Sequence, residues 1–147
     1  MADESLKVDK LELGLKHAWG WYSLHAGQRM KVVNFFLIAV AFLTAAYVTA
    51  LKDERPVVAA VVASAGAVTS VCFWILETRT CKLLEIGRTA LVTLQAELNQ
   101  LGGWTELDLA EKAKLSAHGV YSYRAVINLL TFSAALLFIS AAVNAIQ

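Results

Sequence analysis

Three stretches of this chain contain no Asp, Glu, Lys or Arg: residues 32–51, 56–76 and 125–147. Each is about 20 residues long, which is the length an α-helix needs to cross the hydrocarbon core of a bilayer. Every charged side chain lies in the remaining segments, although 58% of the sequence is hydrophobic. This separation of charge from apolar sequence predicts an all-α membrane protein with three transmembrane helices.

The segments between these stretches are also predicted to be helical. No Pro or Gly interrupts residues 30–51, so a juxtamembrane helix should continue into the first span. Gly102 and Gly103 should end a rod that extends the second span, and a returning helix near 106–118 completes a cytoplasmic hairpin. A chain of 147 residues leaves no room for a separate globular domain of ordinary size. We therefore expect one membrane domain, 1–147, with a juxtamembrane helix 6–31, first span 32–51, second span 56–76, helical hairpin 77–124 and third span 125–147.

The basic residues orient these segments. Residues 1–31 contain five Lys and Arg and residues 77–124 contain six, whereas the loop 52–55 has two that are offset by Asp53 and Glu54. Because Lys and Arg are enriched in cytoplasmic loops, the N-terminus and the hairpin should be cytoplasmic. The loop 52–55 and the C-terminus should then face outward.

Several classes of function are disfavoured by composition and motif. A net charge of +1 lacks the basic excess of a nucleic-acid-binding protein. His17 and His25 have no acidic or Cys ligand between them at metal-binding spacing, and no phosphate-binding loop or nucleophile motif is present. Cys72 and Cys81 are best interpreted as reduced thiols. We expect no catalytic residue, no metal and no cofactor, so the chain is not predicted to be an enzyme.

A polar cluster is predicted at the cytoplasmic end of the first two spans. Trp21, His25 and Arg29 recur every four residues and share one helical face, and Glu77 or Glu85 should lie at a similar depth. The cluster could act as a hinge or gate. The favoured interpretation is an ion-paired juxtamembrane clamp that fixes the first helix against the hairpin.

A leucine seam follows the second span. Its members alternate by three and four positions, as in a coiled coil about three heptads long. The seam could pack on Leu107, Ala110, Ala113 and Ala117 of the returning helix, or between subunits. The second possibility is favoured because those four residues are small or scattered, so we expect a homo-oligomer. The seam comprises Leu84, Gly87, Leu91, Leu94, Leu98 and Leu101.

Polar residues in the third span allow two interpretations. Ser133, Ser140 and Asn144 fall near one helical face and are candidate pore-lining residues. Hydrogen bonding between helices is the more usual role of such residues in bilayers.

The second span carries a face of small residues that would let another helix approach closely. This face consists of Ala59, Ala63, Gly66 or Ala67, and Ser70.

The chain contains two loose patterns of aromatic and helix-register residues: Trp21-(x)3-His25-(x)2-Gln28-Arg29-Met30 leading to Asn34-Phe35-Phe36-Leu37, and Leu76-(x)2-Arg79-(x)7-Gly87-(x)2-Ala90-Leu91-(x)2-Leu94. These patterns resemble a family of small bacterial membrane proteins, the RipA-like proteins. The resemblance implies an octameric inner-membrane ring. The chain also resembles two-span membrane effector modules of prokaryotic antiviral systems, which implies a membrane-perturbing role in bacterial defence. It is expected to differ from them in having a third span and no appended sensor domain.

Two functions are therefore expected for a homo-oligomer in the bilayer. The first is a pore or membrane effector. The second is a non-conducting scaffold whose hairpins recruit a cytoplasmic protein. A central axis lined by Ser133, Ser140 and Asn144 would favour the pore. Leu130, Leu137 and Phe138 around that axis would favour the scaffold.

Overall fold

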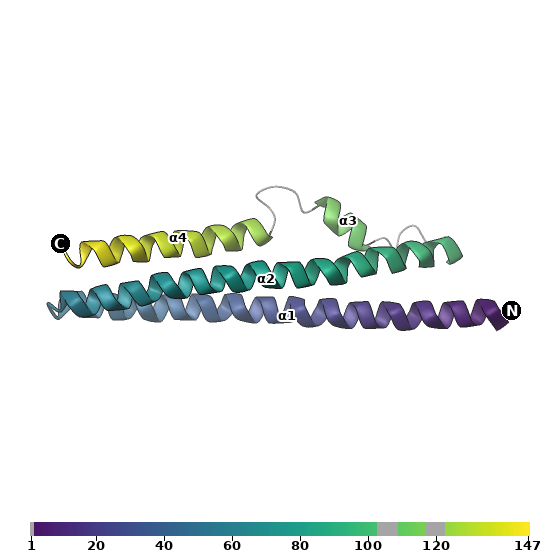
Figure 1. Cartoon of the computed structure of the whole chain (residues 1–147), viewed down its shortest axis with the longest axis horizontal. Helices are drawn as coiled ribbons and strands as arrows, with labels where there is room; N and C mark the ends of the chain where they lie inside the picture. Colours follow the sequence, from purple (N-terminus) through teal and green to yellow (C-terminus); the bar gives the residue numbers. More distant parts are fainter. Residues whose placement is uncertain (1, 103–108, 117–122) are drawn as a thin grey trace. The chain divides into compact units, whose positions relative to one another are not determined.

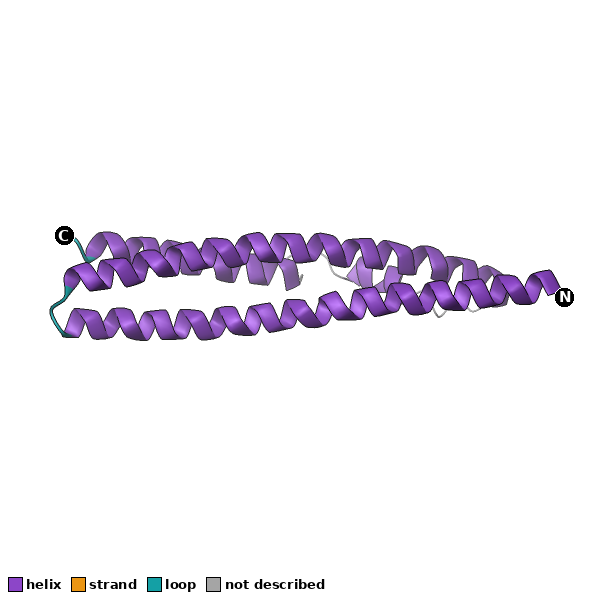
Figure 2. Cartoon of the chain, turned by 60° about the horizontal axis from the view of Figure 1, so that its bottom comes forward, coloured by secondary structure: helices purple, strands orange, loops and turns teal. Residues whose placement is uncertain are grey.

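The protein is all-helical over the residues that its computed structural model describes, 2–102, 109–116 and 123–147 (Figure 1). These ranges contain four α-helices and no strand (Figure 2). The helices are α1 (Ala2–Lys52), α2 (Pro56–Gly102), α3 (Leu109–Ser116) and α4 (Tyr123–Asn144).

Three of these helices, α1, α2 and α4, are long and apolar enough to cross a membrane. The expectation of an all-α chain with three candidate transmembrane helices is confirmed at this level. Helix α2 begins at Pro56 and ends at Gly102, as the residue types at both ends predict. Helix α3 falls within the predicted returning helix, while Leu107 and Ala117 lie outside the described residues.

The turn between α1 and α2 closes α1 with a Schellman motif. Glu54 has φ of 55°, the left-handed conformation that this motif requires and that glycine usually supplies. The amide of Arg55 donates to Ala50 O at 2.9 Å, and the amide of Glu54 donates to Leu51 O at 3.1 Å. These bonds satisfy carbonyls at the end of α1, so the chain can reverse within a few residues.

The described helices form two compact units, of which unit 2 comprises residues 29–79 and 123–147. Here the predicted small-residue face of α2 is buried: Ala59, Ala63 and Ser70 are each 0% exposed. Helix α4 approaches so closely that a Cβ added to Gly66 would lie 2.6 Å from the ring of Phe138. The prediction that this face receives another helix is confirmed, and the helix is α4 of the same chain.

Further contacts among α1, α2 and α4 pack the end of unit 2 near the turn between α1 and α2. Ala50, Ala59, Ala60 and Ala145 form a small apolar cluster with Tyr47 packed against it. The hydroxyl of Tyr47 donates to Ala141 O at 3.2 Å. Elsewhere in the unit, Phe36 of α1 packs against Phe73 of α2, with their ring centroids 5.1 Å apart.

Unit 1 comprises residues 1–28 and 80–122, as far as these are described. Leu11 and Ala18 of α1 and Leu91 of α2 are each 5% exposed and supply its core. A Cβ added to Gly14 would lie 3.3 Å from a methyl group of Leu94, so α1 and α2 pack closely here as well. Helix α3 joins this unit through the amide of Ala110, which donates to the side-chain oxygen of Gln95 at 3.2 Å.

Candidate functional site

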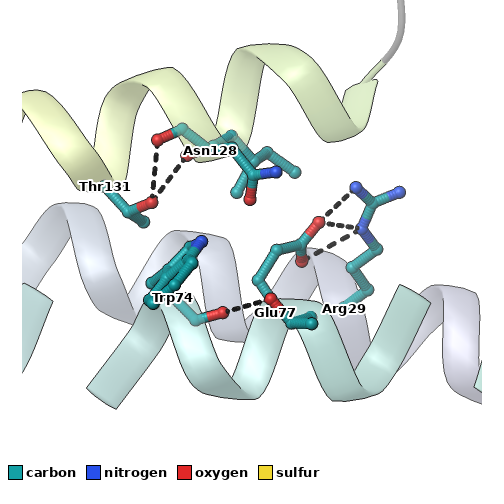
Figure 3. Close-up of polar contacts among 7 residues, drawn as sticks. Arg29, Trp74, Glu77, Asn128 and Thr131 are labelled. Atoms are coloured by element: carbon teal, nitrogen blue, oxygen red, sulfur yellow. Dashed lines mark hydrogen bonds and ion pairs between the residues drawn. The ribbon is translucent and has the colours of Figure 1, made fainter. Parts of the chain in front are cut away.

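The most distinctive polar feature of unit 2 is an ion pair between α1 and α2 (Figure 3). Arg29 Nε donates to Glu77 Oε1 at 2.9 Å and to Oε2 at 3.1 Å, and Arg29 Nη2 also contacts Oε1. The Arg29 side chain is 15% exposed and the Glu77 side chain 3% exposed. A forked, charge-assisted contact of this kind fixes direction as well as distance, so it defines how α1 and α2 are aligned in this unit.

Two residues of α4 complete this polar node, which we define as Arg29, Glu77, Asn128 and Thr131. Thr131 is 2% exposed, and its hydroxyl donates to Ile127 O at 3.0 Å and Asn128 O at 3.1 Å. Figure 3 shows the Asn128 side chain above Trp74 and Glu77. Its Oδ1 atom is buried and has no hydrogen-bond partner among the described residues. The node therefore places polar side chains of three helices close together inside unit 2.

The other predicted clamp residues belong to unit 1. Trp21 Nε1 donates to Leu83 O at 3.1 Å, which joins α1 to α2. The His25 ring packs edge-on against Trp21 with centroids 4.6 Å apart, and His25 Nδ1 lies 3.1 Å from Gln28 Oε1. Glu85 is exposed, and its Oε2 atom lies 3.9 Å from Nη1 of Arg88 on the same helix. Of the two acids considered as partners for Arg29, the structure pairs it with Glu77.

The leucine seam packs against α1, a neighbour that its heptad spacing did not indicate. Leu91 is 5% exposed and Gly87 is buried, whereas Leu101 at the end of α2 is 42% exposed. A Cβ added to Gly87 would lie 2.8 Å from Trp21 Cδ1, and Leu94 contacts the Gly14 position. The N-terminal part of α1 thus packs on the seam within the same chain. This contact covers part of the surface for which packing between subunits was favoured, and the homo-oligomer itself stays a prediction.

The candidate pore-lining residues lie on a different face of α4 from the one packed in unit 2. The buried residues of α4 are Ile127, Thr131, Ala135 and Phe138. Ser140 and Asn144 are exposed and Ser133 is half-buried. At 100° per residue the three polar residues lie more than about 120° from the middle of the packed face. Within one chain they line no internal path, whereas Phe138 fills the space over Gly66.

Sequence reasoning missed two contacts that position these residues. The acceptor for Trp21 is a main-chain carbonyl, which every residue possesses, so no sequence pattern marks Leu83. The contact between Phe138 and Gly66 pairs a common aromatic residue with one of several small residues. The small-residue face of α2 could be recognised in the sequence, but the sequence did not indicate that Phe138 of α4 packs on it.

No group of three or more potential metal ligands occurs among the described residues. No protein-family model, no curated protein and no solved structure matches the chain. The function is therefore argued from the arrangement of the helices and their polar side chains.

Proposed function

We propose that this protein is an integral membrane protein that acts as a homo-oligomer, with the third spans of neighbouring copies surrounding a shared polar path. The observation that carries the proposal is the outward placement of Ser140 and Asn144 on α4. Polar side chains in a span usually face other helices or a water-filled cavity rather than lipid. Because this face does not pack within unit 2, a second copy is the natural neighbour.

Packing inside unit 2 supports the same proposal. Ala63 and Ser70 are fully buried, and Phe138 occupies the space above Gly66, so a conduit through a single chain has no room. A path across the bilayer would have to form between chains. The octameric inner-membrane ring and the defence role implied by the RipA-like and antiviral-effector resemblances belong to this proposal, as does the orientation with a cytoplasmic N-terminus.

A non-conducting scaffold is the second candidate, and exposed apolar side chains in unit 1 favour it. Leu13 is 71% exposed, Trp19 61%, Leu24 58% and Ile86 62%. These side chains lie outside the charge-free stretches and are accessible for contact with another protein. In this alternative the hairpins of the oligomer recruit a cytoplasmic protein, and these exposed side chains contribute to the contact.

The deciding experiment measures the mass of the purified protein in mild detergent and then its conductance in a planar bilayer. We expect a defined oligomer that conducts, with lower single-channel conductance for Ser140→Leu because a hydroxyl is replaced by a bulky apolar group. Ile139→Leu is the matched control, since it places the same residue on an adjacent exposed position. A defined oligomer that stays silent would contradict the pore and favour the scaffold. A monomer would contradict both.

A further inference from the structure

The charged side chains of unit 2 are gathered at the two ends of its spans, and the two ends differ. The turn between α1 and α2 carries Lys52, Asp53, Glu54 and Arg55, whose charges cancel. The opposite ends of the spans carry Arg29, Lys31, Glu77, Arg79 and Arg124. Four cations and one carboxylate leave three positive charges at that end.

The structure identifies which of these cations are available to a partner. Glu77 is buried and paired with Arg29, so these two charges neutralise each other inside the unit. Lys31, Arg79 and Arg124 are exposed, and none of them forms an ion pair with a described residue. We define these three residues, one on each of α1, α2 and α4, as the basic collar.

The collar lies at the depth of lipid headgroups. Lys31 directly precedes the first charge-free stretch, Arg124 directly precedes the third, and Arg79 follows the second by three residues. At 1.5 Å per residue each lies within about 5 Å of the end of its span. The headgroup layer of each leaflet is roughly 5–7 Å thick. The exposed aromatic side chains of Trp74 and Tyr123, near the same ends, suit the same layer.

We propose that the basic collar is a binding surface for anionic phospholipid headgroups. Exposed Lys and Arg form charge-assisted hydrogen bonds with phosphate oxygens, and long basic side chains extend readily to the headgroup level. The buried Arg29–Glu77 pair holds α1 and α2 together within the unit without repelling the lipid, because its carboxylate is neutralised and covered. The proposal rests on the membrane location of the chain and requires neither conduction nor a particular number of subunits.

The test is native mass spectrometry of the full chain in detergent, titrated with phosphatidylglycerol or with phosphatidylcholine of the same acyl chains. We expect tighter binding of phosphatidylglycerol. The variant Lys31→Gln/Arg79→Gln/Arg124→Gln should lose about tenfold or more of that affinity, because each basic group contributes to attraction by an anionic headgroup. Lys52→Gln/Arg55→Gln is the matched control at the other end of the spans and should bind as the original chain does.

A charge-retaining variant guards against effects of folding. Lys31→Arg/Arg79→Lys/Arg124→Lys should keep the preference for phosphatidylglycerol. Equal binding of the two lipids by the original chain would overturn the proposal. So would unchanged binding by the glutamine variant, loss of preference in the charge-retaining variant, or full competition by inorganic phosphate at the concentration of the lipid. A silent or monomeric protein that still prefers phosphatidylglycerol would contradict the proposed pore alone.

Discussion

Unit 2 and unit 1 pack their helices together with different kinds of side chain. In unit 2 the residues with no exposure are Ala59, Ala63 and Ser70, and one buried ion pair accompanies them. In unit 1 the buried positions include Leu11 and Leu91. In lipid there is no hydrophobic driving force between helices, so close contact of small residues and polar bonds must hold them together. In water the burial of leucine is itself favourable.

The two units also differ in the polar contacts that join their helices. Unit 2 buries a charged pair in which each partner satisfies the other, and removing one leaves a charge without compensation. Unit 1 uses the indole of Trp21, whose bond to Leu83 O joins two helices without burying a charge. The units should therefore respond differently to equivalent substitutions, which provides the following tests in order of expected size.

The largest effect is expected from breaking the ion pair of unit 2. Glu77→Ala should lower the free energy of unfolding by about 3–5 kcal/mol, because Arg29 would remain buried without its partner. Equilibrium unfolding in mixed detergent micelles measures the change. Glu85→Ala in unit 1 should change it by less than about 0.5 kcal/mol, since its side chain is 58% exposed.

A double variant sharpens this first test. Arg29→Met with Glu77→Leu should recover most of the lost stability, because apolar residues of similar volume often replace a buried pair without loss. Full stability of the single Glu77→Ala variant would show that the pair does not hold α1 and α2 together.

The second-largest loss of stability is expected from truncating a buried leucine. Leu91→Ala in unit 1 should lower the free energy of unfolding by about 2–5 kcal/mol, as expected for truncating a buried leucine. The same change at Leu137, which is 71% exposed on α4, should have a much smaller effect because its side chain buries little surface within the chain. The same unfolding measurement compares both variants. Equal losses at the two positions would contradict the distinction between the units.

A smaller loss is expected from adding one methyl group to the small-residue face. In Gly66→Ala the new Cβ would lie 2.6 Å from the Phe138 ring, and relieving that overlap should cost about 1–3 kcal/mol. Thermal unfolding in detergent provides the measurement. Gly66→Ala combined with Phe138→Leu should be less destabilised than the sum of the two single changes. Strict additivity would mean that the two residues do not meet.

The smallest effect should be a gain. Gly20 lies inside α1 with nothing within 4 Å of an added Cβ, so Gly20→Ala should raise stability by about 0.5–1 kcal/mol. The helix loses less conformational entropy on folding when alanine replaces glycine. Gly87→Ala is the control in the same unit, where the Cβ would lie 2.8 Å from Trp21 and should disturb its bond to Leu83. Destabilisation by Gly20→Ala would indicate a neighbour on the face that is open within one chain.

Much of the fold followed from the sequence because its signals are local. The charge-free stretches marked the spans, Pro56 marked the start of α2, and Gly102 marked its end. The candidate site was less predictable. The sequence placed both Glu77 and Glu85 near Arg29 in depth. The choice of Glu77 depends on how α1 and α2 are shifted and rotated against each other, which spacing along one helix does not define.

The leucine seam illustrates the same limit. Its heptad spacing identified a surface that had to be covered, but not what covers it, and the structure supplies α1 at Gly14 and Trp21. The Ser133, Ser140 and Asn144 face was also visible in the sequence as a stripe. Its placement opposite the packed side of α4 could not be read from the sequence, because that side is selected by the contact between Phe138 and Gly66.

The sequence alone determined that the chain is helical, that three of its segments suit a bilayer, and where charged residues stop and apolar ones begin. These properties depend on the length of a hydrophobic run and on residue types at helix ends, which act within one segment. Tertiary structure decided the partner of Arg29, the neighbour of the seam and the outward face of α4. Each of these depends on how one helix turns about its axis against another, and that rotation is set by the fit of Gly66, Gly14 and Gly87 to side chains distant in sequence.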